Sequence, residues 1–233
     1  MIAADRYSSS YYARNRGVAG GTGEWILFLD ADVTAPSDIV EHYFTETPRD
    51  RTGLLVGEVV DEAPRTDAGA LARHAWLRQP MAQGNTVGFG RWAYAQTANC
   101  AVRRSAFEEA SGFRENIRSA GDADLCFRLR ELDWGLERRE EARVVHRART
   151  SLPALLRQKA RHGSGIAWIN RVHPGSFPFD PVAVGAVSAR SVAAALSLLV
   201  RRRPGTAVLA CLDLATLWAY QLGRLLPNRV RPR

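Results

Sequence analysis

A run of five apolar residues, Trp25–Leu29, ends directly in Asp30-Ala31-Asp32, and this junction constrains the fold more than any other feature of the sequence. The run has the length of a strand and is apolar on both faces, which is typical of a central strand buried under helices. In open α/β sheets, ligands bind at the carboxyl ends of the strands. We therefore expect the two carboxylates to lie at a ligand-binding edge of a sheet.

Other apolar runs alternate with segments of helical pattern along the chain. Ser105-Ala106-Phe107-Glu108 fits a capping box at the start of one helix. Alternation of this kind predicts an α/β layer fold. We expect strands at residues 25–29, 54–60, 96–102 and 136–146, and helices at 11–19, from about 37, and at 68–77, 123–132 and 152–169.

One segment interrupts any helix, because residues 173–181 contain three prolines and a glycine. We place a domain boundary there. Residues 1–172 would form the α/β domain, residues 173–181 a linker, and residues 182–233 a basic amphipathic helical segment.

The charge of the chain is concentrated after the linker. Of the formal net charge of +8, residues 182–233 carry +7, since they hold eight arginines and a single acid, Asp213. A basic end of this kind indicates contact with an anionic surface. Aromatic residues do not interleave with the arginines in a stacking groove, so we expect no nucleic-acid partner.

Two helices are expected on either side of the arginine run 201–203, each with one wide apolar face. These faces either pack on each other or on the main domain, or form an interfacial hairpin whose arginines meet anionic lipid headgroups. The charge-free stretches, residues 191–200 and 214–223, are shorter than the ~18 to 20 residues that a spanning helix needs. We therefore do not expect a polytopic membrane protein.

The three cysteines contain no CxxC pair, so neither a disulfide framework nor a zinc cluster is expected. The first ten residues lack the basic and apolar regions of a signal peptide. Both observations predict a protein of the reducing cytoplasm.

Five short motifs stand in a fixed order within residues 8–169: ARNRG at 13–17, GEWILFLDAD at 23–32, NCAVRRSAF at 99–107, GFRE at 112–115 and GDADLCFRL at 121–129. Together they resemble the nucleotide-binding region of family 2 glycosyltransferases, which are inverting enzymes of the GT-A fold. The resemblance implies a Rossmann-like mixed sheet with helices on both faces. It also implies transfer of a sugar from a nucleotide-diphosphate sugar to an acceptor hydroxyl.

The resemblance assigns roles to three carboxylates. Asp32 matches the position that binds the divalent cation, Mn²⁺ or Mg²⁺, and Asp30 the position that faces the ribose or the water shell of the metal. Asp122 matches the general base, which must reach the acceptor hydroxyl on the face opposite the leaving group. The glutamate that usually precedes this base is replaced by Gly121. Asp124 fits a first-turn residue that is favourable to the helix dipole.

Three further residues are candidates with two readings each. His146 ends a strand and matches a position where many relatives place a histidine near the metal, and it could equally be a structural histidine. Arg14 and Asn15 either touch the nucleotide or cap the helix before Gly17.

The resemblance starts part-way into the family pattern. Family members begin with a strand and a loop that grip the nucleotide base, followed by a strand with an acidic pair, and this sequence starts after both. We expect strand 25–29 to have an exposed apolar edge. A mis-assigned start, a remnant, or a half completed by another polypeptide would each account for this pattern, and we favour the first.

The sequence therefore predicts a metal-assisted, inverting hexosyltransferase of cell-envelope polysaccharide or glycolipid synthesis. Its acceptor would be a polysaccharide or a lipid-linked molecule, and its place the inner face of the cytoplasmic membrane. One alternative is a catalytically silent remnant that binds an anionic membrane or a partner through its Arg-rich helices. Another, a haloacid-dehalogenase-type phosphatase, needs a lysine between its two acidic motifs, whereas Lys159 is the sole lysine and follows both.

Overall fold

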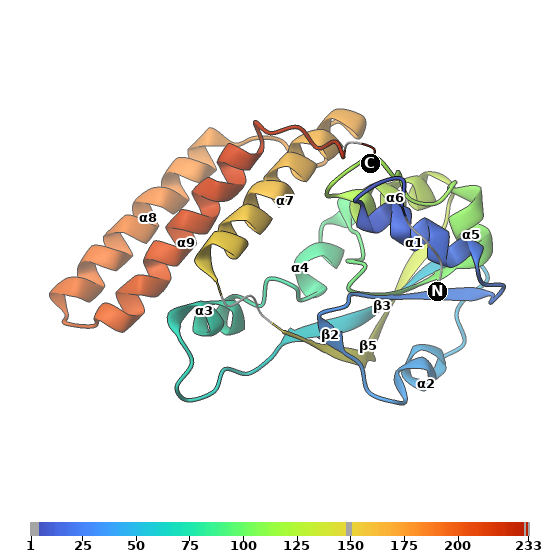
Figure 1. The fold of residues 1–233 in the computed structure, drawn as a ribbon, viewed down its shortest axis with the longest axis horizontal. Coiled ribbons are helices and arrows are strands. Elements are labelled where there is room, and N and C mark those ends of the chain that lie inside the picture. Colours follow the sequence, from blue (N-terminus) through green and yellow to red (C-terminus); the bar gives the residue numbers. More distant parts are fainter. Residues whose placement is uncertain (1–4, 148–150, 231, 233) are drawn as a thin grey trace. The chain divides into compact units, whose positions relative to one another are not determined.

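The computed structural model describes residues 5–147, 151–230 and 232. The chain forms two compact units (Figure 1). The sheet unit comprises Met1–Glu62, Gln79–Arg147 and Arg229–Arg233, and the helical unit comprises Ala63–Arg78 and Ala148–Asn228.

The sheet unit is built on a mixed five-stranded sheet in the order β1-β4-β3-β5-β2. The β3–β5 pair is parallel and the other three pairs are antiparallel. This arrangement confirms the α/β fold with a mixed sheet. The strands are β1 (Trp25–Leu29), β2 (Val33–Thr34), β3 (Thr52–Asp61), β4 (Asn99–Arg103) and β5 (Gly135–His146).

Strand β1 lies at an edge of this sheet, so the prediction of a central strand is wrong. Its residues pair with β4, from Trp25 opposite Arg103 to Leu29 opposite Asn99. Among the described residues no strand pairs with its other side. Leu29 is 38% exposed, which confirms the expectation of an exposed apolar edge.

Helices cover both faces of the sheet (Figure 1). Helix α2 lies against one face, and α1, α5 and α6 lie against the other. Two short turns of helix, α4 and η1, precede β4. The bounds are α1 (Ser10–Ala19), α2 (Ile39–Phe44), α4 (Gly84–Val87), η1 (Gly90–Trp92), α5 (Arg104–Glu109) and α6 (Gly121–Glu131).

The core has one layer on each face because side chains alternate along β1. On the α2 side, the Trp25 ring meets the Phe44 ring at 5.7 Å, and Leu27 packs on the buried cluster around Tyr43. On the opposite side, the Phe28 ring meets the ring of Phe113 at 5.3 Å. The carboxyl end of β1 is thus held by apolar packing on both faces.

The starts of α5 and α6 differ from the expected pattern. The capping box at Ser105 is wrong, because α5 already begins at Arg104 and its N-cap, Arg103, makes no side-chain cap bond. Arg103 is the last residue of β4, so the strand passes directly into the helix. Helix α6 begins at Gly121, two residues earlier than expected, which places Asp122 in its first turn.

The helical unit contains α3 (Ala70–Arg78), α7 (Leu152–Val172), α8 (Pro181–Val200) and α9 (Pro204–Gly223). Helices α7 and α9 approach closely, because a Cβ atom on Gly163 would collide with the Tyr220 carbonyl and one on Gly223 with the Ala160 carbonyl. Helix α7, which the sequence assigned to the α/β domain, packs on α9 and belongs to the helical unit.

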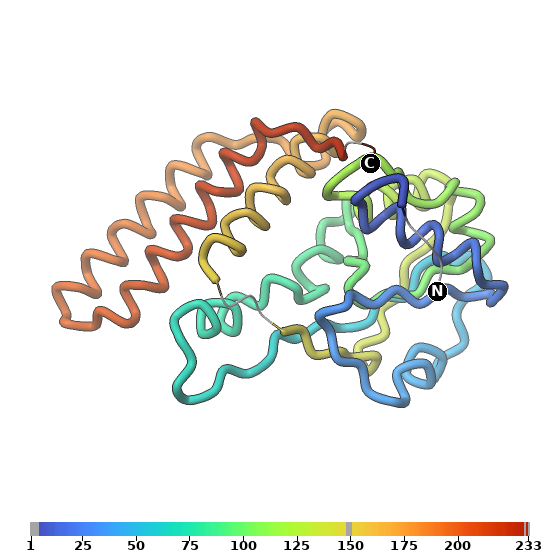
Figure 2. The backbone as a smooth tube through the Cα atoms, in the orientation of Figure 1, coloured from blue at the N-terminus to red at the C-terminus, as the bar shows by residue number. Residues whose placement is uncertain are grey.

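Helices α8 and α9 form a hairpin (Figure 2), joined by a left-handed turn at Arg202 with φ of 54°. Each helix is 20 residues long. The most apolar 18 residues of α8 and of α9 have a mean hydropathy of 1.8 and 1.2, and only 6% and 22% of these residues are buried. By length and composition both could cross a membrane. Both helices are longer than the charge-free stretches from which their length was judged, because α8 also contains Arg190 and α9 also contains Asp213.

Candidate functional site

The turn that follows β1 holds the first two candidate carboxylates. The Asp30 N–H donates to the Ala98 carbonyl at 3.3 Å, and the Val33 N–H donates to the Asp30 carbonyl at 3.3 Å. The chain therefore reverses tightly between β1 and β2. Asp30 and Asp32 lie at the carboxyl end of β1, where the sequence placed them.

Helix α1 brings Arg14 to this turn. The Arg14 guanidinium donates to the Asp30 carboxylate and lies 5.6 Å from the centre of the Tyr11 ring. Ser9 caps the helix, since its hydroxyl accepts from the Tyr12 N–H. The role of Arg14 in the structure is thus an ion pair with Asp30 and not a helix cap.

Asp122 interacts with the same pair of charges. Burial raises the pKa of Asp122, and the charge of Asp30 raises it further, whereas the Ala123 N–H, 3.1 Å from its carboxylate, and the charge of Arg14 lower it. Arg14 lies 5.6 Å from the centre of the Tyr11 ring, and Gly121, next to Asp122, packs against the same ring, so the start of α6 lies beside the Arg14–Asp30 ion pair. The structure therefore brings together a proposed base and two proposed nucleotide-binding residues.

The backbone that presents Asp122 is strained. Ala120, which precedes α6, has a φ of 67°, in the left-handed region that a non-glycine residue occupies at a cost of about 1–3 kcal/mol. Gly121 follows, and a Cβ atom there would come within 2.7 Å of the Tyr11 ring. The Tyr11 ring thus occupies the space that the usual glutamate side chain would need.

His146 ends β5 between two other strands. It pairs with Val33 of β2 on one side and with Asp61 of β3 on the other. Its Nδ1 lies 2.6 Å from the Asp61 Oδ1, and its Nε2 lies 3.8 Å from the Asp32 Oδ2. The hydrogen bond with Asp61 raises the pKa of His146, burial lowers it, and the nearby charges of Asp61, Asp32 and Asp30 raise it.

Asp61 is a residue that the sequence analysis missed. Its side chain is fully buried, and its Oδ2 accepts no hydrogen bond from any residue that the structure describes. Asp61 ends the apolar strand β3, so the rule that drew attention to Asp30 and Asp32 would also have found it. Its burial against His146 indicates a carboxylate that orients the imidazole.

The donors present fit a cation that shares its coordination with a substrate. Over residues 5–147, 151–230 and 232, no group of three or more His, Cys, Asp or Glu could hold a metal ion. Asp32 and His146 nevertheless face each other at 3.8 Å, too far for a hydrogen bond. Mg²⁺ characteristically binds one or two protein carboxylates together with water and substrate phosphates, so a sparse protein donor set suits this class of ion.

Asn15 has contacts of a different kind. Its amide nitrogen donates to the Phe113 carbonyl at 2.8 Å and to the Glu115 carboxylate at 3.0 Å, and its amide oxygen accepts from the Phe113 N–H at 3.0 Å. These bonds fasten α1 to the loop before α6. A contact between Asn15 and nucleotide stays a prediction.

Asp124 is fully buried in a structural ion pair. Arg114 and Arg128 both contact its carboxylate, with the Arg128 Nη2 at 2.9 Å and the Arg114 Nε at 3.2 Å. Arg128 also donates to the Gly112 carbonyl at 2.7 Å. Asp124 thus fixes the loop before α6, which leaves Asp122 as the acidic residue of this turn that can meet a substrate.

The family follows from comparison of the whole chain with known proteins. The family model of glycosyl transferase family group 2 matches residues 25–224, which span β1, the carboxylate turn, Asp122 and His146. The chain belongs to glycosyl transferase family group 2. Membership confirms the resemblance read from the motifs.

Two curated relatives and one solved structure illustrate the relationship. The pre-mycofactocin glycosyltransferase of Mycobacterium tuberculosis is 31% identical over 166 residues, covering 70% of this chain and 35% of that protein. The glycosyltransferase AglE of Haloferax volcanii is 24% identical over 165 residues, covering 71% of this chain and 53% of that protein. The chain thus spans about a third to a half of the length of these two relatives.

The solved structure is a mannosyltransferase, PcManGT, from Pyrobaculum calidifontis, in complex with GDP-Man and Mn²⁺. It aligns with a TM-score of 0.55 at 14% identity and covers 91% of this chain and 66% of its own. This likeness confirms the fold, an α/β architecture of the GT-A type.

Proposed function

We propose that this family group 2 protein transfers a sugar from a nucleotide-diphosphate sugar to an acceptor hydroxyl with inversion at the anomeric carbon. The observation that carries the proposal is the grouping of Arg14 and Asp30 with Asp122 around the Tyr11 ring, beside the turn that presents Asp32. The residues that bind the donor must lie close to the base that activates the acceptor hydroxyl, and this grouping allows it.

Asp122 would act as the general base. A base must hold its proton weakly enough to be free at working pH and strongly enough to take one from a hydroxyl, so a raised carboxyl pKa favours catalysis. Burial supplies that rise. The charge of Arg14 and the Ala123 N–H oppose this rise in the pKa of Asp122 by favouring the ionised carboxylate.

Asp32 and His146 would hold a divalent cation, Mn²⁺ or Mg²⁺, at the diphosphate. When bound, the cation neutralises charge on the departing nucleoside diphosphate. Asp61 would keep the His146 ring in place, and Arg14 would orient Asp30 toward the ribose. Support for this class of cofactor comes from the Mn²⁺ and GDP-Man bound by the archaeal mannosyltransferase.

The setting that we propose is cell-envelope synthesis at the inner face of the cytoplasmic membrane, with a polysaccharide or lipid-linked acceptor. The support is the uneven charge, since residues 182–233 carry seven of the eight net positive charges. A basic end favours peripheral contact with anionic lipid.

The first test is nucleotide binding by the protein and by one matched pair of variants. We expect GDP, UDP or dTDP with Mn²⁺ to raise the melting temperature, because a ligand that binds the folded state stabilises it. Asp32→Ala should abolish the rise. Asp50→Ala should retain it, since Asp50 is exposed in the turn before β3.

An equal rise in the Asp32→Ala variant would contradict the metal assignment. A rise with nucleotide alone, unchanged by Mn²⁺, would leave nucleotide binding intact and remove the cation from the proposal. No rise with any of the three nucleotides would contradict the donor class.

A further inference from the structure

We propose that the α8–α9 hairpin lies in the plane of a lipid bilayer, at the boundary between headgroups and acyl chains, and does not cross it. This inference deepens the membrane contact proposed above. It is argued from the surface of the helical unit alone.

Helix α8 exposes apolar side chains that a helix of a soluble protein would bury. No residue of α8 is buried. Positions that are partly shielded recur every three or four residues, as expected of the stripe that packs on α9, and two of them are serines. The shielded positions are Val184, Ser188, Ser191, Ala195 and Leu198.

The outward surface of α8 divides into two sides. One side is apolar and exposed, with Val192, Leu196 and Leu199 at 44%, 59% and 54%. The other side carries Arg190 and Arg201, which recur at helical spacing. A helix with an apolar side and a basic side is typical of one that lies in a membrane interface.

Helix α9 also presents an apolar stripe to the outside. Val208, Cys211, Trp218 and Leu222 are exposed and follow one another at intervals of three, seven and four residues, which keeps them on one side of the helix. Trp218 adds an aromatic ring of the kind that is enriched at membrane interfaces.

The opposite side of α9 is polar at mid-helix, and this decides against a spanning helix. Asp213 is two residues from Cys211 and therefore faces away from the apolar stripe. Its carboxylate contacts His74 at 2.9 Å and Arg78, both on α3. The Arg78 side chain is 55% exposed, so this cluster meets water.

A spanning α9 would place the Asp213–Arg78 pair at the centre of the bilayer, where charged side chains are most costly. It would also carry α7 into the acyl chains, together with the exposed Arg157 and Arg161. An in-plane hairpin avoids both costs. The apolar sides meet acyl chains while α3 and α7 remain in water.

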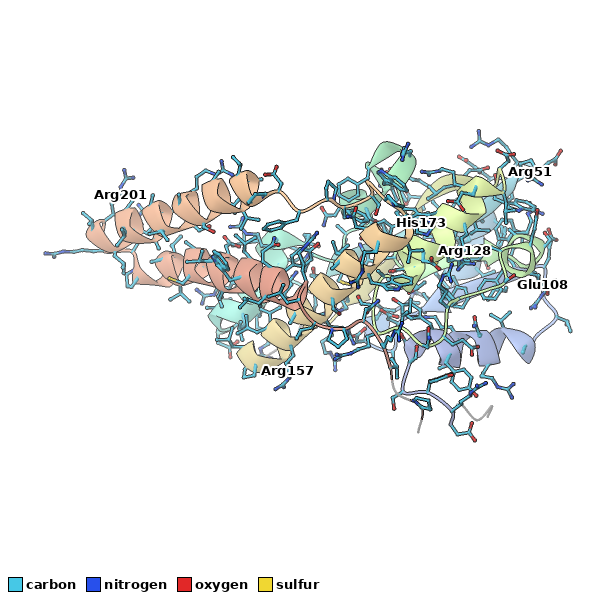
Figure 3. The ribbon with its side chains drawn as sticks, turned by 90° about the horizontal axis from the view of Figure 1, so that it is seen from above. Arg51, Glu108, Arg128, Arg157, His173 and Arg201 are labelled. Carbon is cyan, nitrogen blue, oxygen red and sulfur yellow. The ribbon has the colours of Figure 1, made fainter. Side chains whose placement is uncertain are left out.

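The turn of the hairpin supplies charge that complements a lipid surface. Arg201, Arg202 and Arg203 are all exposed, and Figure 3 shows Arg201 at the end of the hairpin. Basic residues at a membrane surface pair with anionic headgroups. An apolar surface bordered by arginines therefore fits anionic lipid better than a second copy of the chain, whose own arginines would repel them.

The chain contains a natural depth probe for this proposal. Of its three cysteines, Cys211 is exposed on the apolar stripe, whereas Cys100 and Cys126 are buried. A polarity-sensitive fluorophore on Cys211 of the full chain can be mixed with vesicles of phosphatidylcholine, with or without phosphatidylglycerol. Nitroxide lipids, labelled either near the headgroup or near the acyl end, then report its depth.

We expect a blue shift with anionic vesicles that weakens with added salt, and stronger quenching by the headgroup-proximal nitroxide. Stronger quenching by the acyl-end nitroxide would overturn the in-plane orientation. A blue shift that grows with protein concentration without vesicles would identify a second copy as the occupant and overturn the lipid assignment. No shift under any condition would overturn the proposal entirely.

Two sets of variants separate the apolar and the charged contributions. Replacing Arg201, Arg202 and Arg203 by serine should weaken binding to anionic vesicles roughly 100-fold, and Leu196→Gln with Leu199→Gln should weaken binding to both vesicle types. Arg157→Ser on α7 is the matched charge control and should change binding less than about threefold, because Arg157 lies on the water side. Equal losses in this control would overturn the orientation.

Lipid binding and the Mn²⁺-dependent nucleotide shift are separate measurements on the same protein. If the protein shows the nucleotide shift but does not bind lipid, the hairpin proposal alone is refuted. If it binds lipid but shows no nucleotide shift, the proposed transferase chemistry alone is refuted.

Discussion

Strand β3 of the sheet unit and helix α8 of the helical unit are both strongly apolar, yet one is hidden and the other exposed. Eight of the ten residues of β3 are buried, whereas none of the twenty residues of α8 is. An apolar segment inside a sheet gains stability from burial, while an exposed one is retained when another apolar phase or partner covers it. The comparison teaches that apolar composition in this chain has two separate uses.

The charged and titratable residues of the proposed site and those of the α8–α9 hairpin differ in the same way. Asp61, Asp124 and His146 of the sheet unit are buried, and they position the proposed site or the loops beside it. In the helical unit, Arg190 and the arginines at 201–203 are exposed. We therefore expect substitutions in the sheet unit to act on chemistry and folding, and those in α8 to act on lipid contact.

The largest effect should follow from Asp122→Asn. Removing a general base costs typically ~10²–10⁴-fold in rate, so transfer from a nucleotide sugar should fall in that range while nucleotide affinity remains. Radiolabelled donor and product separation would measure the rate. If the variant instead loses nucleotide binding and has a lower melting temperature, Asp122 is a structural residue, as Asp124 is.

The same residue predicts a pH dependence. Asp122 acts as a base only when ionised, and because its pKa is raised, activity should fall on acidification at a higher pH than an ordinary aspartate would give. The residual activity of Asp122→Asn should not show this fall at low pH. If the same fall persists in the variant, another group is responsible for it.

The next largest effect should come from Leu55→Ala in β3. Leu55 is completely buried, and truncation of such a leucine leaves a cavity that costs about 2–5 kcal/mol in the free energy of unfolding. Urea denaturation of both proteins would measure it. A cost below about 1 kcal/mol would mean that this core can collapse around the loss.

Asp61→Asn should have an intermediate effect. Carboxylates that orient a metal-binding histidine typically contribute ~10–100-fold in metal affinity, so we expect Mn²⁺ affinity in the presence of GDP to fall in this range. Electron paramagnetic resonance of free Mn²⁺ provides a readout that is independent of turnover. Combining the change with His146→Gln should add little further loss.

If Asp61→Asn lowers only the melting temperature and leaves Mn²⁺ affinity unchanged, Asp61 serves the fold and not the site. Asp61 would then be a structural residue, like Asp124 in its buried ion pair.

The smallest effect on stability should come from Leu196→Ala in α8. Because Leu196 is 59% exposed, we expect the free energy of unfolding to change by no more than about 0.5 kcal/mol, in contrast to Leu55→Ala. Denaturation without lipid measures this difference. A loss as large as that of Leu55→Ala would show that α8 is packed against protein in solution and would break the comparison.

Sequence reasoning found the long elements and the carboxylate positions, because apolar periodicity in β1 and β3 and the charges at strand ends are local signals. It did not find β2, which has two residues and exists through pairing with β5. It also misjudged β1 as central, since the apolar composition of a strand does not specify its neighbours.

Three features of the structure depend on contacts distant in sequence. The Asp61–His146 hydrogen bond joins residues 85 positions apart, and the Asn15–Phe113 bonds join residues 98 apart. The close approach of Gly163 to Tyr220, which groups α7 with α9, is equally non-local. The motifs could rank Asp122 and Asp32 as candidates, but only the fold shows that Arg14 already holds Asp30.

The excursion of the chain through α3 has a practical consequence for protein engineering. The backbone leaves the sheet unit after Glu62, returns at Gln79, and after Asn228 comes back once more to bond at residues 116 and 117. A stop codon after residue 147 would therefore strip α3 of its Asp213 contact and remove the returning tail. A fragment that holds the sheet unit alone would need a short linker in place of residues 63–78, together with a graft of the tail.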